Sequence, residues 1–149
     1  MTRYYDIDEA NAALPEIERI LLDLKDQRAE LIRLRDAVLA ASGSGSGTGG
    51  GGEGEGPAQG SASGSRSTVE RRRMRLRMQG LIDQMQAGVT RLVEADVTLR
   101  EIETGLIDFP ALASGRPIWL CWRLGERDIE WWHEHDTGFA GRQRLADLT

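Results

Sequence analysis

The sequence of 149 residues has few of the features that cross-link, export or anchor a protein. Its single cysteine, Cys121, cannot form an intramolecular disulfide. No apolar run approaches the roughly 20 residues that a membrane span needs, and the first residues do not resemble a signal peptide. We therefore expect a cytoplasmic protein that is not inserted in a membrane.

Positive charges are outnumbered, with 19 Lys and Arg against 24 Asp and Glu, and the formal net charge is −5. Arginine supplies nearly all of the positive charge, because Lys25 is the only lysine. An acidic chain is a poor general binder of nucleic acid, so no such partner is expected. The weak exception is an arginine cluster at the expected start of a helix, which is typical of a solvated basic face but would also suit phosphates or an acidic partner. The cluster consists of Arg71, Arg72, Arg73, Arg75 and Arg77.

Aromatic residues make up only 5% of the sequence, yet all four tryptophans stand within residues 118–136. The single cysteine and both histidines lie in the same stretch. Specific chemistry is therefore expected there. Alternation along a strand places Trp119 and Trp122 on opposite faces, so we expect these rings to pack in a core or an interface rather than to stack on a ligand.

The N-terminal part of the chain has the pattern of a long amphipathic helix. Asp6 and Glu9 form a capping pattern, and apolar residues then recur every three or four positions, which predicts a helix over residues 7–41. Pro15 cannot donate a helical hydrogen bond. It predicts either a kink or a break into two helices.

A second capping pattern, Ser67–Glu70, predicts another helix over residues 68–95. Residues 42–66 are mostly Gly and Ser and predict a disordered connector, because such a segment buries too little apolar surface to offset its ordering entropy. Two helices joined by a flexible loop favour an antiparallel, coiled-coil-like hairpin. A bare hairpin leaves apolar surface exposed, so we expect a homodimer.

Residues 97–136 are β-rich, and residues 137–149 have the character of an irregular tail that packs back on the rest. The predicted fold is a single α+β domain over residues 1–149, in which the long helical hairpin packs with a short antiparallel β-sheet. The clearest hairpin signal is the turn at Gly125-Glu-Arg-Asp128.

The length of this turn decides whether Cys121 and His133 share a face of the sheet. A four-residue loop pairs Cys121 with Glu130 and places it on the face opposite His133. A three-residue loop pairs Cys121 with Trp131, on the same face as His133. Both registers are compatible with the sequence.

The same stretch contains side chains that bind metals or transfer protons. His133 and His135 would lie on one face of a strand and are weak candidates for a metal site. A small buried cysteine and a histidine hydrogen-bonded at the sheet edge are the simpler interpretation. Arg142, within Gly138-Phe-Ala-Gly-Arg142, could hold a small anion.

Several segments together carry a family resemblance. They are Tyr5–Glu16, Gly105–Pro110, Leu120–Glu126, Trp132–Glu134 and Gly138–Gln143. With them the chain resembles a bacterial family known as domain of unknown function 2203, through nearly its whole length except the Gly/Ser stretch. The residues that match the recurring polar and aromatic positions of that family are Asp108, Cys121, Trp122, Glu126, His133 and Arg142.

His135 lies outside that family pattern, and the resemblance implies no defined activity. Two functions of different classes remain. We favour a non-enzymatic, dimeric interaction or regulatory module in the bacterial cytoplasm. The alternative is a small-ligand- or metal-binding protein or an enzyme, with His133 as acid, base or ligand and Glu126 and Asp108 as carboxylates. Arg142 would then clamp an anion, while the sequence identifies no cofactor.

Overall fold

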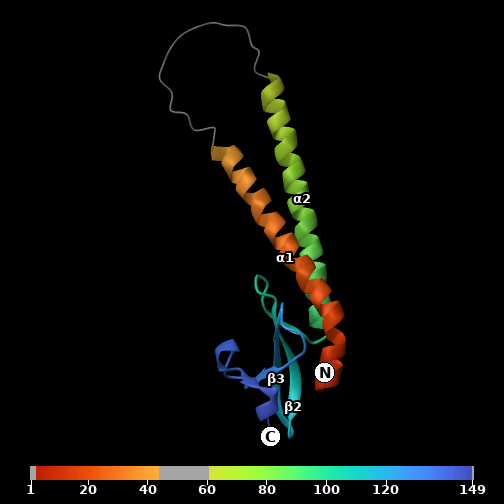
Figure 1. Cartoon of the computed structure of the whole chain (residues 1–149). Coiled ribbons are helices and arrows are strands. Elements are labelled where there is room, and N and C mark those ends of the chain that lie inside the picture. The colour runs from red at the N-terminus through yellow and green to blue at the C-terminus, as the bar shows by residue number, and fades with distance from the viewer. Residues whose placement is uncertain (1–2, 44–60, 149) are drawn as a thin grey trace. The chain divides into compact units, whose positions relative to one another are not determined.

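The computed structural model describes residues 3–43 and 61–148. Two long helices precede a five-stranded antiparallel sheet, so the predicted α+β fold is confirmed (Figure 1). Neither helix in the described ranges is apolar over a length that could cross a membrane. The elements are α1 (Ile7–Gly43), α2 (Ser61–Glu94), β1 (Thr98–Glu101), β2 (Leu106–Ala113), β3 (Arg116–Arg123), β4 (Trp131–His133) and β5 (Gln143–Arg144), with short 3₁₀ helices at Phe139–Gly141 and Leu145–Asp147.

The chain divides into two compact units. The helical unit, residues 27–84, contains the second part of α1 and most of α2. The sheet unit, residues 1–26 and 85–149, contains the start of α1, the end of α2 and all the strands. Each unit is described in turn.

The first helix begins where the capping pattern predicts. The backbone N–H of Glu9 donates to Asp6 Oδ1 at 2.7 Å, and α1 starts at Ile7. These backbone hydrogen bonds lower the pKa of Asp6 because they stabilise its charged form. α1 then continues through Pro15 as one helix, so the predicted break into two helices is not found. Leu14 beside the proline is 5% exposed, and its burial helps to hold the helix together there.

The second helix begins earlier than its capping pattern predicts. α2 starts at Ser61, so Ser67–Glu70 lies inside the helix and the expected start at residue 68 is wrong. Residues 61–66 contain no proline, and the backbone can therefore continue helically ahead of the capping pattern. Residues 44–60 of the predicted connector lie outside the described residues.

The end of α2 falls close to its predicted position. Asp96 adopts a left-handed conformation with φ of 59°, and the Val97 N–H donates to the Leu92 carbonyl at 2.9 Å. This is the bond that closes a helix in a Schellman motif. Asp96 also accepts the backbone N–H of Arg3 at 3.0 Å, which ties the N-terminal segment to the helix end.

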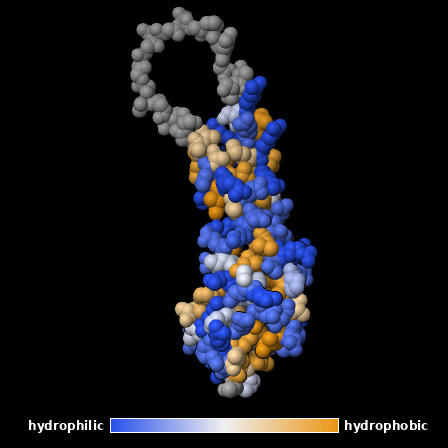
Figure 2. All heavy atoms as spheres, viewed as in Figure 1, coloured by the Kyte–Doolittle hydropathy of each residue, from blue (hydrophilic) through white to orange (hydrophobic). Residues whose placement is uncertain are grey.

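In the helical unit, the two helices run antiparallel. Arg77 on α2 donates to both carboxylate oxygens of Glu30 on α1, at 2.9 and 3.0 Å. The arginine cluster of residues 71–77 lies well inside α2 rather than at its start, so the helix dipole does not oppose it there. On the face drawn in Figure 2, hydrophilic residues alternate with smaller apolar patches. Large apolar side chains exposed in this unit are Leu39, Val69 and Leu76.

In the sheet unit, the strand order is β1-β2-β3-β4-β5, and β2 and β3 form its long central pair (Figure 1). One face of the sheet is apolar and packs against the start of α1. The rings of Tyr5 and Phe109 pack in a T-shaped arrangement with 5.0 Å between their centroids. Side chains of this face that are at most 5% exposed are Ile107, Phe109, Ala111, Ile118, Leu120, Trp122 and Trp132.

The opposite face of the sheet carries the polar groups. Directly paired residues of an antiparallel sheet share a face. Asp108 is paired with Cys121, which is paired in turn with Trp131, and Trp119 is paired with His133. These side chains all belong to the face turned away from the apolar core.

Candidate metal centre

The register of β3 and β4 brings Cys121 and His133 to one face. Of the two registers that the sequence allows, the structure has the one that pairs Cys121 with Trp131. Gly125 adopts a φ of 101°, which a residue with a side chain rarely takes. Glu126 accepts the Arg123 N–H at 2.8 Å and so closes the turn. The turn lies within residues 122–130, which connect the last paired residues of β3 and β4.

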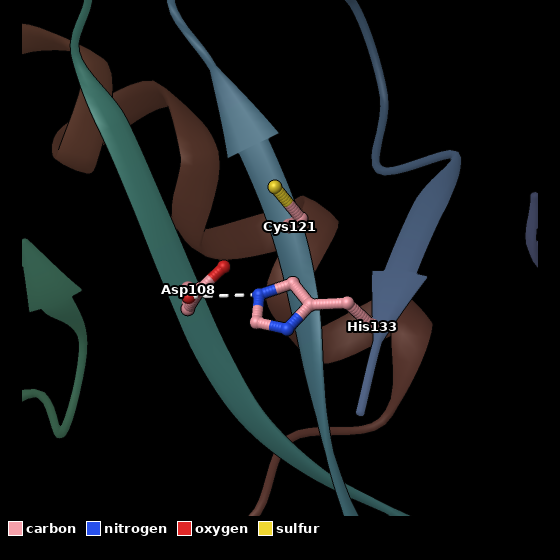
Figure 3. A group of neighbouring side chains, drawn as sticks. All are labelled: Asp108, Cys121 and His133. Carbon is pink, nitrogen blue, oxygen red and sulfur yellow. Dashed lines mark hydrogen bonds and ion pairs between the residues drawn. The ribbon is translucent and has the colours of Figure 1, made fainter. Parts of the chain in front are cut away.

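Asp108, Cys121 and His133 form a compact polar cluster. They come from the neighbouring strands β2, β3 and β4, and Asp108 and His133 point toward each other across β3 (Figure 3). One ligand atom from each lies within 4.8 Å of the others. All three side chains are buried, at 1–3% exposure.

The hydrogen bonds of His133 define its chemical state. Its Nδ1 lies 2.7 Å from the carbonyl oxygen of Glu134. A carbonyl can only accept, so we assign the proton to Nδ1. In the neutral ring, Nε2 then carries a lone pair, and it lies 3.0 Å from Asp108 Oδ2. Two acceptors at that distance repel unless a proton or a metal ion joins them.

Asp108 has one satisfied oxygen and one unsatisfied oxygen. Its Oδ2 accepts Arg100 Nε at 2.8 Å in addition to facing His133. Its Oδ1 is buried and has no hydrogen-bond partner among the described residues. An orphaned carboxylate oxygen is costly in a buried site and indicates room for a further ligand.

Arg100 was missed as a site residue from the sequence. It stands on the short strand β1, two residues after Thr98. Residues two apart on a strand point to the same face, so this spacing was a signal that Arg100 could lie on the face of Thr98. A bulge between Leu99 and Glu101 disturbs the pairing at this point, and pattern alone does not reveal it.

Cys121 is a thiol in the metal-free protein. Burial raises its pKa from 9.0 to about 11, and the charge of Asp108 adds to the increase. Arg142 Nη1, 4.0 Å from Sγ, opposes the increase without cancelling it. His133 Nδ1 and Nε2 are directed at Glu134 and Asp108, so neither ring nitrogen is a hydrogen-bond partner of the Cys121 thiol.

Glu126 and Arg142 form a second pair beside Cys121. Arg142 donates to the two carboxylate oxygens of Glu126 at 3.1 Å each, and its guanidinium lies 4.4 Å from the ring centroids of Trp131 and Phe139. The carboxylate that contacts His133 is thus that of Asp108, whereas Glu126 pairs with Arg142.

Two other candidates lie apart from the cluster. Trp122 is on the apolar face, where its Nε1–H donates to the Arg127 carbonyl at 3.2 Å. The ring of His135 stacks on Trp119 at 4.6 Å between centroids. Its nitrogens are not among the three ligand atoms that converge.

A cavity of about 240 Å³ opens beside the cluster. Its walls include the three clustered residues, and Leu106 and Phe139 add apolar surface. Arg100 and His135 bring polar groups to the same space. A buried N, O and S donor set beside an accessible cavity can hold a metal ion and present it to a small ligand.

Comparison with known proteins gives a family and no activity. No curated protein and no solved structure matches the chain significantly. The family model described as "Uncharacterized conserved protein (DUF2203)" matches residues 3–145, which include every residue of the cluster. The chain therefore belongs to the DUF2203 family of uncharacterised conserved proteins.

Proposed function

We propose that this protein binds a divalent transition-metal ion of the zinc class through Asp108, Cys121 and His133. The observation that carries the proposal is the convergence of the three residues, whose ligand atoms lie within 4.8 Å of one another on buried side chains. With the ring proton on Nδ1, His133 Nε2 and the Asp108 carboxylate meet as two acceptors, and a bound cation would give each of them a ligand bond. Imidazole, thiolate and carboxylate are the three ligand types that zinc takes from proteins.

The surroundings of the three residues support this role. A metal-binding histidine usually donates its other ring N–H to a carbonyl or carboxylate, as His133 Nδ1 does to Glu134. Arg100 holds one oxygen of Asp108, and the unpartnered Oδ1 is left for a ligand bond. A divalent ion with one carboxylate and one thiolate has no formal net charge, which suits a buried site.

The rival arrangement is a shared proton. His133 would then be an imidazolium paired with Asp108, beside the Arg100 guanidinium that already occupies Oδ2. Two cations would share a single buried carboxylate, and Oδ1 would keep no partner. We favour the metal because a ligand bond to Oδ1 would give that buried oxygen a partner while Oδ2 keeps its hydrogen bond from Arg100. When bound, the ion would supply Lewis-acid chemistry to a ligand in the cavity.

The test is metal uptake by the full chain after treatment with a chelator. Titration with Co²⁺ is expected to saturate at one ion per chain and to give a thiolate-to-cobalt charge-transfer band. Cys121→Ser should abolish the band, and His133→Gln should weaken binding by more than about 100-fold, the upper end for residues that only support a ligand. Circular dichroism of each metal-free variant checks that it folds.

The matched control is His135→Gln, which removes the other histidine of the chain and leaves the three ligands in place. It should bind Co²⁺ like the wild type. Absence of saturable Co²⁺ uptake by the wild type, or an equal loss of Co²⁺ affinity in both histidine variants, would refute the proposal. A thiolate ligand must stay reduced, so the proposal fits a cytoplasmic protein.

A self-associating module is a second candidate, and it retains the dimer that the sequence led us to expect. Its support is the exposed apolar surface of the helical unit, where Leu39 is 61% and Leu76 68% exposed. Sedimentation equilibrium of the wild type and of Leu76→Glu tests it. Association that weakens in the variant is expected, and a concentration-independent monomer would rule it out.

A further inference from the structure

The geometry points to a small organic oxyanion as the ligand of the cavity, with its carboxylate or phosphate group held between Arg100 and the metal ion. The inference rests on the proposed metal site and names the chemical class that this site would take. It assigns Arg100 as the anion-binding residue, in place of Arg142.

The donors of the two arginines differ in availability. Both terminal nitrogens of Arg142 donate to Glu126, so this guanidinium is already satisfied. Arg100 uses only Nε, toward Asp108. Its two Nη nitrogens have no hydrogen-bond partner in the described part of the chain, and the side chain is 42% exposed while lining the cavity.

Arg100 is also held in a defined orientation. The bond from Nε to Asp108 fixes one edge of the planar guanidinium at 2.8 Å. Its Cζ lies 5.0 Å from the ring centroid of Trp119. A guanidinium held in this way presents its remaining N–H groups as a preorganised fork, which matches the two oxygens of a carboxylate or phosphate.

The charges around the cavity favour an anion. In the proposed site, the thiolate and Asp108 balance the divalent ion, which leaves the charge of Arg100 uncompensated. Asp136 is the other carboxylate of the cavity wall, and it is exposed, so water screens its charge. Glu126 and Glu134 are paired with Arg142 and Arg116 respectively.

The cavity limits the size of the ligand. Its volume of about 240 Å³ is below the range of roughly 300–1,000 Å³ that suits drug-sized molecules. Leu106 and Phe139 line part of the wall. We therefore expect a short organic acid or a small phosphate ester, with the charged group at Arg100 and an apolar part against these two side chains.

The experiment uses the Co²⁺-loaded full chain, with acetate and inorganic phosphate as separate probes. Saturable changes in the cobalt visible spectrum are expected with at least one of them. Arg100→Gln should weaken the response at least about tenfold while cobalt still binds, and Arg100→Lys should retain part of it because the charge remains. Acetate and phosphate distinguish the two oxyanion types.

The control is Arg116→Gln, which removes another arginine of the sheet unit that is not in the cavity wall and is paired with Glu134. It should respond like the wild type. Normal cobalt loading with no response to either probe overturns this inference and leaves the metal site standing. If no cobalt binds, phosphate titration of the metal-free protein, followed by the NMR signal of Arg100 Nε–H, decides whether the anion subsite exists alone.

Discussion

Glu126 and Arg142 are joined by two parallel hydrogen bonds of 3.1 Å, and this pair fastens the C-terminal tail to the turn between β3 and β4. The side chain of Arg142 is only 14% exposed and that of Glu126 19%, and the guanidinium is flanked by Trp131 and Phe139. Partly buried, two-bonded pairs of this kind are stronger than exposed ones. This pair therefore adds a charged side-chain contact to the pairing of β4 with β5 that also holds the tail.

Arg142→Ala should reduce the free energy of unfolding by about 1.5–3 kcal/mol, because it removes charged hydrogen bonds and aromatic packing together. Urea unfolding followed by tryptophan fluorescence measures the change. Arg116→Ala is the control, since its pair with Glu134 is 57% and 32% exposed and should contribute about 1 kcal/mol or less. Equal losses in the two variants would contradict this account.

Gly105 should not tolerate a side chain. Its φ is 65°, and a Cβ there would lie 2.4 Å from the Cγ and Cδ1 atoms of Leu124. Gly115 has a similar φ of 79° but nothing within 4 Å of its Cβ position. Gly115→Ala should cost about 1 kcal/mol from backbone strain, and Gly105→Ala at least about 1 kcal/mol more from crowding. Urea midpoints that fall equally would show that crowding plays no part.

Stability should fall at high pH because of Cys121. Burial raises the pKa of its thiol from 9.0 in an exposed chain to about 11 in the folded protein. Above pH 9 the unfolded chain loses this proton while the folded protein keeps it, so unfolding becomes more favourable up to pH 11. The full effect is about 3 kcal/mol, and it is absent below pH 9.

The measurement is the free energy of unfolding between pH 8 and pH 11 in the presence of a chelator, for the wild type and for Cys121→Ala. Burial also raises the pKa of Tyr5, but that group is common to both proteins. The difference between the two curves therefore isolates the thiol. A difference that stays constant over this range would refute the predicted effect.

Asn11 should stabilise the folded protein through the hydrogen bond that its side-chain oxygen accepts. Its Oδ1 accepts the backbone N–H of Ile129 at 2.8 Å, and Ile129 is 4% exposed. Asn11→Ala leaves that buried N–H without a partner and should cost about 1–3 kcal/mol. Asn11→Asp keeps an acceptor and should lose much less. Thermal unfolding of the two variants distinguishes the hydrogen bond from simple loss of volume.

The helices show how much of the fold local sequence can predict. Asp6 and Glu9 mark the start of α1 correctly because capping depends on residues within one turn. The similar pattern at Ser67–Glu70 was a wrong start signal. These residues can cap a helix but can also lie inside one, and α2 begins six residues earlier, at Ser61. Pro15 did not split α1, because burial around it outweighs one missing hydrogen bond.

The site was only partly predictable. The apolar pattern predicted strands that contain Cys121 and His133, but a shift of one residue in the pairing moves Cys121 to the other face. The pairing of Cys121 with Trp131 in the structure places it on the face of His133. The contact between His133 and Asp108 spans 25 residues and crosses an intervening strand, which no local pattern encodes. Arg100 was missed because the bulge between Leu99 and Glu101 interrupts the pairing of β1 with β2.

The contact between Tyr5 and Pro110 also bears on aggregation. β1 pairs with β2 only as far as Asp108, so the rest of that edge of β2 has no neighbouring strand. There the Tyr5 N–H donates to the Pro110 carbonyl at 2.7 Å, and Pro110 itself has no N–H to offer. A strand from another molecule would find the acceptor occupied and the donor missing. The N-terminal segment thus covers the open sheet edge at Pro110, and a chain shortened beyond Tyr5 would lose this hydrogen bond.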